Sequence, residues 1–315
     1  MTTLARQALR PRVAVVAAVL AVAAFVSVGA VGVERYGSNY WLYRGFPPPH
    51  DASYVTSRGS EETISVTSPA LGGRSQQVVV YLPPGYATDP ERRYPVLYLL
   101  HGFPGRPLAF LDTVQMGVVE DELAALGEAQ PLILVMPFGS TSQFTDKEWA
   151  NGTGKGQGWE TFVARDVVGA IDARFRTIPT GAARGIGGLS EGGYGAINIA
   201  LHHPGEFDVV ESWSGYERPD RIRSIFGTGL RLLATNDPLT ELPAVAPRLR
   251  ASHTYFWLYS GASDPMRPQN SLFAAELARA RIAHTFFEPS GGHNWALWRA
   301  EAEAAYLAAA GRLHG

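Results

Sequence analysis

The chain contains no cysteine, so it can form no disulfide and can carry out no thiol chemistry. It also lacks a cluster of metal-ligating residues and a glycine-rich phosphate loop, so we expect neither a metal nor a cofactor. Nor is there an excess of charge of one sign: 27 Lys and Arg against 29 Asp and Glu give a formal net charge of −2, with both signs interspersed. The sequence therefore predicts no nucleic-acid partner.

One long apolar segment is present near the amino terminus. Residues 13–33 are apolar or small except for Ser27, and residues 1–12 contain three arginines and no acid. This charge flank is typical of an export signal, and the length is close to the ~20 residues that span a bilayer. We therefore predict a cytoplasmic tail over 1–12 and a transmembrane signal anchor over 13–33, with the rest of the chain extracytoplasmic. Cleavage after Val28-Gly29-Ala30, and hence secretion, is the alternative.

The remaining sequence predicts one linker and one large domain. Residues 34–60 are rich in proline and glycine and have little periodicity, which is typical of a linker. Residues 61–315 are enough for one α/β domain with a large core. Segments with strand patterns are 61–67, 76–82, 94–100, 131–136, 207–213, 254–260 and 283–288, and those with helical patterns are 159–175, 193–201 and 271–282. Residues 214–250 are less regular, as expected of a lid over a substrate pocket.

A serine between glycines is the most informative motif. Gly188-Leu189-Ser190-Glu191-Gly192 follows a short apolar segment and precedes a predicted helix, which is the order of a nucleophile elbow. The small flanking residues avoid collisions with the neighbouring strand and helix. The pattern predicts that Ser190 is a nucleophile and that the N–H of Glu191 faces a developing oxyanion. Because a carboxylate would repel an oxyanion, we expect the Glu191 side chain to point outward or to pair with a cation.

A nucleophilic serine needs a base and an acid that orients the base. In the order Ser, Asp, His, the candidate acid is Asp264, which follows the apolar segment 254–260. Active sites of α/β sheets lie at such strand ends. His293 lies in a glycine-containing loop after the last predicted strand and is the predicted general base. Other carboxylates in this region are alternatives for the acid: Asp208, Asp220, Asp237 and Glu288.

A second oxyanion donor is expected from a loop after an earlier strand. The segment 94–100 runs into His101-Gly102-Phe103-Pro104-Gly105, and we predict the N–H of Phe103 as this donor. His101 is interpreted as a residue that braces the loop, because the base is already assigned. His202 and His203 close the helix after the elbow and are predicted to be structural.

Several further motifs, one of which includes His293, are shared with one known family. They are Tyr81-Leu82-Pro83-Pro84-Gly85-Tyr86, Leu99-Leu100-His101-Gly102, Trp159-Glu160-Thr161-Phe162, His203-Pro204 with Phe207, and His293-Asn294-Trp295 with Trp298. Over roughly residues 60–305 the chain resembles the esterase D and mycolyltransferase family of α/β-hydrolases, which also contains feruloyl esterases. The resemblance implies an α/β-hydrolase fold, with a mostly parallel central sheet and helices on both faces.

The resemblance also implies roles for individual residues. It implies Ser190 as nucleophile, Asp264 as acid and His293 as base. It implies an oxyanion hole from the backbones of Phe103 and Glu191. The mycolyltransferase pattern has a glutamate as acid and a methionine after the serine, so this chain departs from that pattern at two positions.

We predict an extracytoplasmic serine esterase that hydrolyses carboxylic esters through an acyl-enzyme. One alternative is an acyltransferase that moves an acyl group to a sugar or lipid hydroxyl; another is a non-catalytic, cell-wall-binding member of the fold. Trp159, Trp295 and Trp298 are candidate substrate contacts, with core packing or anchoring of a helix as the other interpretation. The expected partners are an ester or acyl-lipid or acyl-sugar substrate, and the membrane through the amino-terminal segment.

Overall fold

The computed structural model describes residues 46–142 and 144–314, together with residues 19, 20, 22 and 26. The predicted tail over 1–12, most of the anchor over 13–33 and the first part of the linker lie outside the described residues. Within the described part of the chain, no helix has both the length and the apolar character needed to cross a membrane. The chain divides into two compact units, Met1–Pro47 and Pro48–Gly315, and the second contains every element discussed below.

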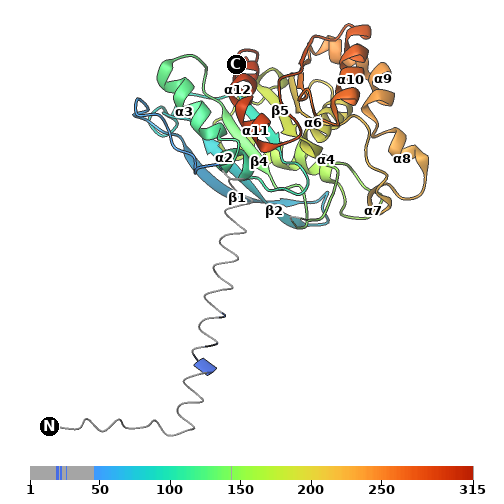
Figure 1. Cartoon of the computed structure of the whole chain (residues 1–315), viewed down its shortest axis with the longest axis horizontal. Coiled ribbons are helices and arrows are strands. Elements are labelled where there is room, and N and C mark those ends of the chain that lie inside the picture. Colours follow the sequence, from blue (N-terminus) through green and yellow to red (C-terminus); the bar gives the residue numbers. More distant parts are fainter. Residues whose placement is uncertain (1–18, 21, 23–25, 27–45, 143, 315) are drawn as a thin grey trace, which may run out of the picture. The chain divides into compact units, whose positions relative to one another are not determined.

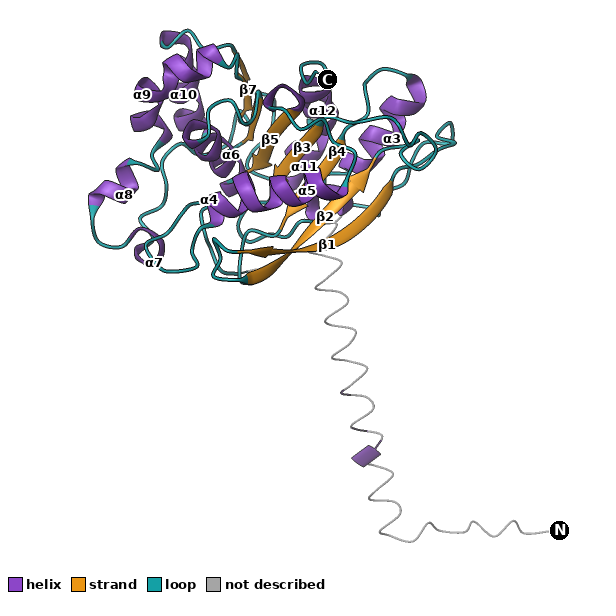
Figure 2. Ribbon diagram, turned by 180° about the vertical axis from the view of Figure 1, so that it is seen from behind, coloured by secondary structure: helices purple, strands orange, loops and turns teal. Residues whose placement is uncertain are grey.

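An eight-stranded sheet forms the centre of the second unit (Figures 1 and 2). Its order is β1-β2-β4-β3-β5-β6-β7-β8; β1 and β2 form an antiparallel hairpin, β2 is antiparallel to β4, and all later pairs are parallel. The strands are β1 (Ser60–Ser68), β2 (Arg74–Leu82), β3 (Val96–Leu100), β4 (Ile133–Pro137), β5 (Arg184–Leu189), β6 (Val209–Trp213), β7 (Tyr255–Tyr259) and β8 (His284–Phe287). The predicted mixed, mostly parallel sheet is confirmed.

Helices cover both faces of the sheet, because strands buried on two sides need apolar partners on each. One apolar core packs against α4 (Trp159–Thr161), the π-helical turn η1 (Phe162–Val167), α5 (Val168–Arg174), α6 (Glu191–His202), α9 (Pro238–Ala251) and α10 (Arg267–Arg279). The core on the opposite face packs against α2 (Ala109–Asp112), α3 (Met116–Leu126), α11 (Trp295–Ala300) and α12 (Ala302–Ala310). A short 3-10 helix, η2 (Gly181–Ala183), precedes β5. Figure 2 shows α4, α5 and α6 in front of the sheet, and Figure 1 shows α3, α11 and α12.

The segment 214–250 is more regular than the sequence analysis expected. After the short helices α7 (Arg223–Phe226) and α8 (Leu230–Ala234), it forms the fourteen-residue helix α9. Asp237 begins α9 by accepting the N–H of Thr240, and Pro238 occupies the first turn, where a missing N–H is tolerated. The buried residues of α9 are Pro238, Leu242, Val245, Ala246 and Leu249. An irregular lid over the whole segment is therefore wrong, because an apolar stripe docks its second half on the core.

The described part of the predicted linker is attached to α3. The backbone N–H of Ala52 donates to Glu122 at 3.1 Å, and the N–H of Gly59 donates to Asp121 at 2.9 Å. Residues 48–60 therefore belong to the same compact unit as the sheet.

Candidate active site

The nucleophile elbow has the steric form that its glycines predict. Ser190 joins β5 to α6 at φ 55° and ψ −122°, a backbone conformation that non-glycine residues rarely adopt. A Cβ at Gly188 would lie 2.5 Å from the carbonyl oxygen of Leu100 in β3, and a Cβ at Gly192 would overlap the same carbonyl. Both positions therefore have to be glycine, as the sequence analysis expected.

The structure brings together Ser190, His293 and Asp264. The Nε2 atom of His293 lies 2.8 Å from the Oγ atom of Ser190, and its Nδ1 atom lies 3.1 Å from the Oδ2 atom of Asp264. The three residues follow β5, β7 and β8, whose carboxyl ends share one edge of the sheet. The chain of two hydrogen bonds links hydroxyl, imidazole and carboxylate in the order that activates a serine.

Asp264 is held as a carboxylate. Its side chain is fully buried, and burial alone would raise its pKa. Hydrogen bonds from His293 and from the backbone N–H of Met266, which lies 2.8 Å from Oδ1, outweigh burial and lower the pKa of Asp264 below its usual value. The carboxylate therefore stays charged and fixes the orientation of the imidazole.

The loops that carry the acid and the base are tied to each other. The N–H of Ala262 donates to the carbonyl of Pro289 at 2.8 Å, and the N–H of Ser263 donates to the carbonyl of Gly291 at 2.8 Å. Gly261 lets the loops approach, because a Cβ there would lie 2.5 Å from the Gly291 carbonyl oxygen. The distance between Asp264 and His293 is thus set by backbone contacts.

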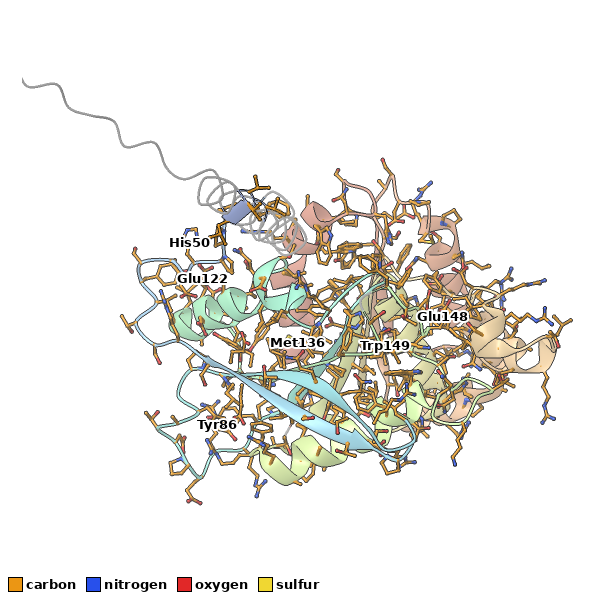
Figure 3. All side chains as sticks on the ribbon, turned by 90° about the horizontal axis from the view of Figure 1, so that it is seen from below. His50, Tyr86, Glu122, Met136, Glu148 and Trp149 are labelled. Atoms are coloured by element: carbon orange, nitrogen blue, oxygen red, sulfur yellow. The ribbon has the colours of Figure 1, made fainter. Side chains whose placement is uncertain are left out.

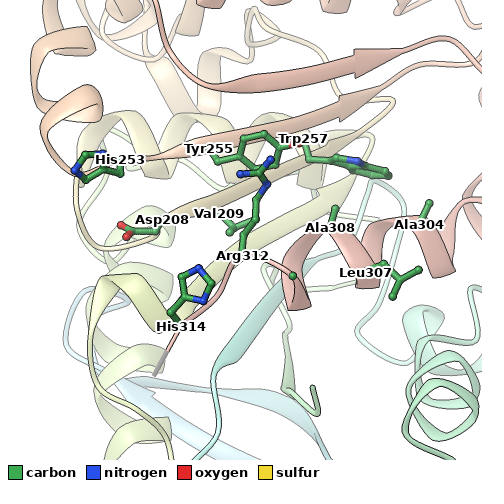
Figure 4. Close-up of a pocket in the computed structure, with 11 residues that line it drawn as sticks. Asp208, Val209, His253, Tyr255, Trp257, Ala304, Leu307, Ala308, Arg312 and His314 are labelled. Carbon is green, nitrogen blue, oxygen red and sulfur yellow. The ribbon is translucent and has the colours of Figure 1, made fainter. Parts of the chain in front are cut away.

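The other carboxylates that the sequence offered as acids have different surroundings. Asp237 caps α9, Glu288 pairs with Arg267 at 3.1 Å, and the N–H of Asp220 donates to Glu148. Asp208 lines a cavity of about 700 Å³ at the amino ends of β6 and β7, opposite the edge that carries Ser190 (Figure 4). Other residues of this cavity are His253, Tyr255, Trp257, Leu307, Arg312 and His314.

The loop after β3 runs directly against the nucleophile. A Cβ at Gly102 would lie 2.9 Å from Cδ1 of Leu189 and 3.1 Å from Cβ of Ser190, so only glycine allows this approach. Phe103 follows Gly102 in the same loop. Glu191 is the first residue of α6, where a backbone N–H has no acceptor within the helix. Both predicted oxyanion donors are therefore in segments that adjoin Ser190.

His101 braces this loop. Its Nδ1 atom lies 2.9 Å from the carbonyl oxygen of Gly102, and its Nε2 atom accepts the N–H of Gly139 at 3.2 Å. Burial lowers the pKa of His101 to about 4, so the ring is neutral and can donate at one nitrogen and accept at the other.

The three candidate tryptophans lie in two different places. The Trp298 ring lies 5.1 Å from the His293 ring, edge to face, and Trp295 lies 5.1 Å from Trp298. Trp159 is fully buried in the core on the α6 side and packs against Phe162.

The two histidines at the end of α6 have a structural partner. His202 and His203 bond the two carboxylate oxygens of Glu160 at 2.8 and 3.0 Å. They tie α6 to α4, which agrees with the predicted structural role.

The expectation for the Glu191 side chain is wrong. It is only 5% exposed and is hydrogen-bonded to the carboxyl group of Asp146, in the loop after β4. Burial, followed by repulsion from Asp146 and Glu148, raises its pKa well above the usual value. Burial therefore favours the neutral form of Glu191, at a position where a carboxylate would repel an oxyanion.

Trp149 is a residue of the site that sequence reasoning missed. Its indole is fully buried and donates to the carbonyl of His101 at 3.0 Å, and its ring lies 4.9 Å from the His101 ring. Both Glu148 and Trp149 have positive φ, 53° and 47°. No local motif marks these positions, because their conformation depends on packing against distant segments.

Comparison with known proteins identifies the family. Residues 68–308 match the esterase family described as "Putative esterase". The chain belongs to this family. The chain is 34% identical over 155 residues to an esterase of Mycobacterium tuberculosis, covering 49% of this chain and 32% of that protein. It is 25% identical over 285 residues to a diacylglycerol acyltransferase/mycolyltransferase of Mycobacterium bovis, covering 77% of this chain and 78% of that protein.

The solved structures show the same fold. A ferulic acid esterase superimposes with a TM-score of 0.71 at 24% identity, covering 81% of this chain and 99% of that chain. The α/β-hydrolase fold is thereby confirmed. The chain spans about a third of the length of the M. tuberculosis esterase. Among the described residues, no group of three or more His, Cys, Asp or Glu could hold a metal ion.

Proposed function

We propose that the esterase hydrolyses carboxylic esters with Ser190 as nucleophile, His293 as general base and Asp264 as orienting acid. The continuous hydrogen bonding from Ser190 through His293 to Asp264 is the observation that carries the proposal. His293 takes the Ser190 proton while Oγ attacks the ester carbonyl, and then gives that proton to the departing alcohol. Water, deprotonated by His293, cleaves the acyl-enzyme and releases the acid and free Ser190.

The backbone N–H groups of Phe103 and Glu191 support the tetrahedral intermediates. The close approach of Gly102 to Ser190 and the position of Glu191 at the start of α6 support this assignment. Such preorganised donors stabilise charge that appears only in the transition state. Trp295 and Trp298 would wall the adjoining acyl site, because Trp298 packs on the catalytic imidazole.

The test is p-nitrophenyl ester turnover by residues 46–315, with Ser190→Ala compared with the wild type. We expect a fall in kcat of at least about 10⁴-fold, since the nucleophile is lost while the oxyanion donors remain. Ser290→Ala is the matched control, because this exposed serine lies in the His293 loop without contacting the triad. Retained turnover in Ser190→Ala would reject the proposal, as would absence of fluorophosphonate labelling at Ser190.

A second candidate is acyl transfer, because the M. bovis relative is named as an acyltransferase. The same assay decides between the two when trehalose or glycerol is added as acceptor. Equal amounts of phenol and free acid support hydrolysis. Phenol released without matching acid would show that an alcohol replaces water.

We further propose that the apolar segment 13–33 anchors the enzyme in the membrane with its catalytic domain outside the cytoplasm. The apolar length and the three preceding arginines support this placement. Mass spectrometry of the amino terminus in the membrane fraction tests it. A chain that begins near Val31 would show cleavage and contradict the anchor.

A further inference from the structure

A cluster of three carboxyl groups adjoins the nucleophile; we call Asp146, Glu148 and Glu191 the carboxyl cluster. The Glu191 side chain is hydrogen-bonded to Asp146, and the N–H of Glu148 donates to Oδ1 of Asp146 at 2.9 Å. Glu148 in turn accepts the Tyr216 hydroxyl at 2.6 Å and the N–H of Asp220 at 3.0 Å. The cluster thus joins the loop after β4, the first turn of α6 and the loop after β6.

The bond between Asp146 and Glu191 requires a proton, because two ionised carboxylates have no donor to offer each other. The charges around the cluster do not replace that proton. Lys147 is the cation that acts on Asp146, whereas the charged groups that act on Glu191 and Glu148 are themselves carboxylates, including Asp220. Burial raises the pKa of Glu191 well above its usual value and that of Glu148 to about 8.

The same loop sets the position of the oxyanion segment. Its two positive-φ residues, Glu148 and Trp149, are labelled in Figure 3. The buried indole of Trp149 donates to the His101 carbonyl, 3.0 Å away. The indole fits because glycines face it: a Cβ at Gly195 would lie 2.6 Å from Cβ of Trp149, and a Cβ at Gly139 would overlap its ring. The positive φ angles of Glu148 and Trp149 are strained backbone conformations, which persist only where surrounding contacts enforce them. The carboxyl cluster therefore holds the Glu148–Trp149 segment on one side, and the hydrogen bond from the Trp149 indole to His101 holds it on the other.

We propose that Asp146 and Glu191 share one proton, and that this shared proton holds the Glu148–Trp149 segment in the position that orders both oxyanion donors. Asp146 is then a positioning residue for the proposed hydrolysis, on which this inference rests. Loss of the proton leaves two buried charges that repel each other, one of them on the residue next to Ser190. The developing oxyanion is then disfavoured and the Glu148–Trp149 segment is held less firmly. As a result, kcat falls at alkaline pH while KM changes less.

The test compares kcat and KM from neutral to alkaline pH in the wild type, Asp146→Asn and Glu191→Gln, each normalised to its own neutral value. In Glu191→Gln the carboxamide keeps a donor for Asp146 and has no proton to lose, so no charge appears at residue 191 at any pH. Asp146→Asn keeps an ionisable Glu191 but removes the neighbouring carboxyl group that helps to raise its pKa. We expect kcat of the wild type to fall by about tenfold or more at alkaline pH. This is less than the roughly 10²–10³-fold loss of kcat that follows removal of an oxyanion donor, because the donors here remain in place. Glu191→Gln should lack this fall, whereas Asp146→Asn should show it at lower pH, because Glu191 then lacks the carboxyl group that helps to raise its pKa.

Glu120→Gln is the matched control. Glu120 is also fully buried, but it lies in α3 on the other face of the sheet, where the N–H of Leu132 and the hydroxyl of Tyr306 bond it. This variant should keep the alkaline fall of the wild type. An alkaline fall that persists in Glu191→Gln, that keeps its midpoint in Asp146→Asn, or that is absent from the wild type, would overturn the shared proton.

Failure of the proposed hydrolysis would look different, since turnover would then be absent or independent of Ser190 at every pH. The melting temperature provides a readout that needs no activity. A buried proton that the unfolded chain releases makes stability fall as pH rises. The melting temperature of the wild type should therefore fall more steeply with pH than that of Glu191→Gln. Equal slopes would overturn the inference whatever the enzyme hydrolyses.

Discussion

Glu211 offers a quantitative test of how the sheet responds to pH. It lies in β6, is fully buried, and accepts the indole N–H of Trp213 at 2.9 Å. It faces Gly187 of β5, where a Cβ would lie 3.0 Å from its own Cβ. Burial raises the pKa of Glu211 from its usual 4.5 to about 8.

The sign follows from proton binding. Between these two values the unfolded chain has released the proton and the folded chain still holds it, so stability falls as pH rises and levels off above the folded pKa. At 1.36 kcal/mol for each pH unit, the interval from 4.5 to about 8 corresponds to roughly 5 kcal/mol of unfolding free energy. Glu211→Gln keeps an acceptor for the Trp213 indole and cannot ionise. The variant should therefore lose this part of the pH dependence.

The assay is urea unfolding of the wild type and Glu211→Gln at a series of pH values. We expect the two to be similar near pH 4.5 and the variant to be more stable, by up to roughly 5 kcal/mol, above pH 8. Glu303→Gln, which removes an exposed carboxylate from α12, should follow the wild type. Parallel curves for the wild type and Glu211→Gln would refute the reasoning.

Three further predictions concern the catalytic acid, the stability of the fold at acid pH and the packing around Trp149. Asp264→Asn should lower kcat by about 10⁴-fold, because the imidazole loses its orienting charge; a loss below tenfold would contradict the assigned acid. Although burial opposes it, bonding to the two histidines at the end of α6 lowers the pKa of Glu160 from 4.5 to about 2. This shift should contribute roughly 3 kcal/mol to the unfolding free energy above pH 4.5, and the contribution should be lost as pH falls through about 2. An acid titration of stability should show this loss in the wild type and not in Glu160→Gln. Gly195→Ala should lower kcat and should lower stability by about 1–3 kcal/mol, because the added Cβ would collide with Trp149. Gly169→Ala in α5 is the control: its Cβ would face open space, so neither kcat nor stability should fall.

The parts of the site that follow local rules could be predicted from the sequence. The elbow is marked by glycines that close packing demands on either side of Ser190. Asp264 and His293 are marked by their position just after apolar strands, and a parallel sheet brings such ends together. The apolar segments also predicted the strands themselves, whereas their order in the sheet comes from the structure alone.

The parts that depend on distant packing could not be predicted. Nothing near Glu191 indicates that Asp146, from another loop, would bury and bond its side chain. The role of Trp149 depends on left-handed backbone at a non-glycine residue and on glycines in two other segments. Helix α9 was missed because the buried stripe that fixes it lies among prolines and charged residues.

The position of β8 has a consequence for how the proposed activity would be lost on heating. This strand has four residues, lies at the edge of the sheet, and leads into the loop that carries His293. Edge elements with few buried side chains fray at a lower free energy than the protein as a whole. Heating should therefore displace the base while the central strands are still intact. Thermal inactivation would then be a local, reversible event that precedes global denaturation.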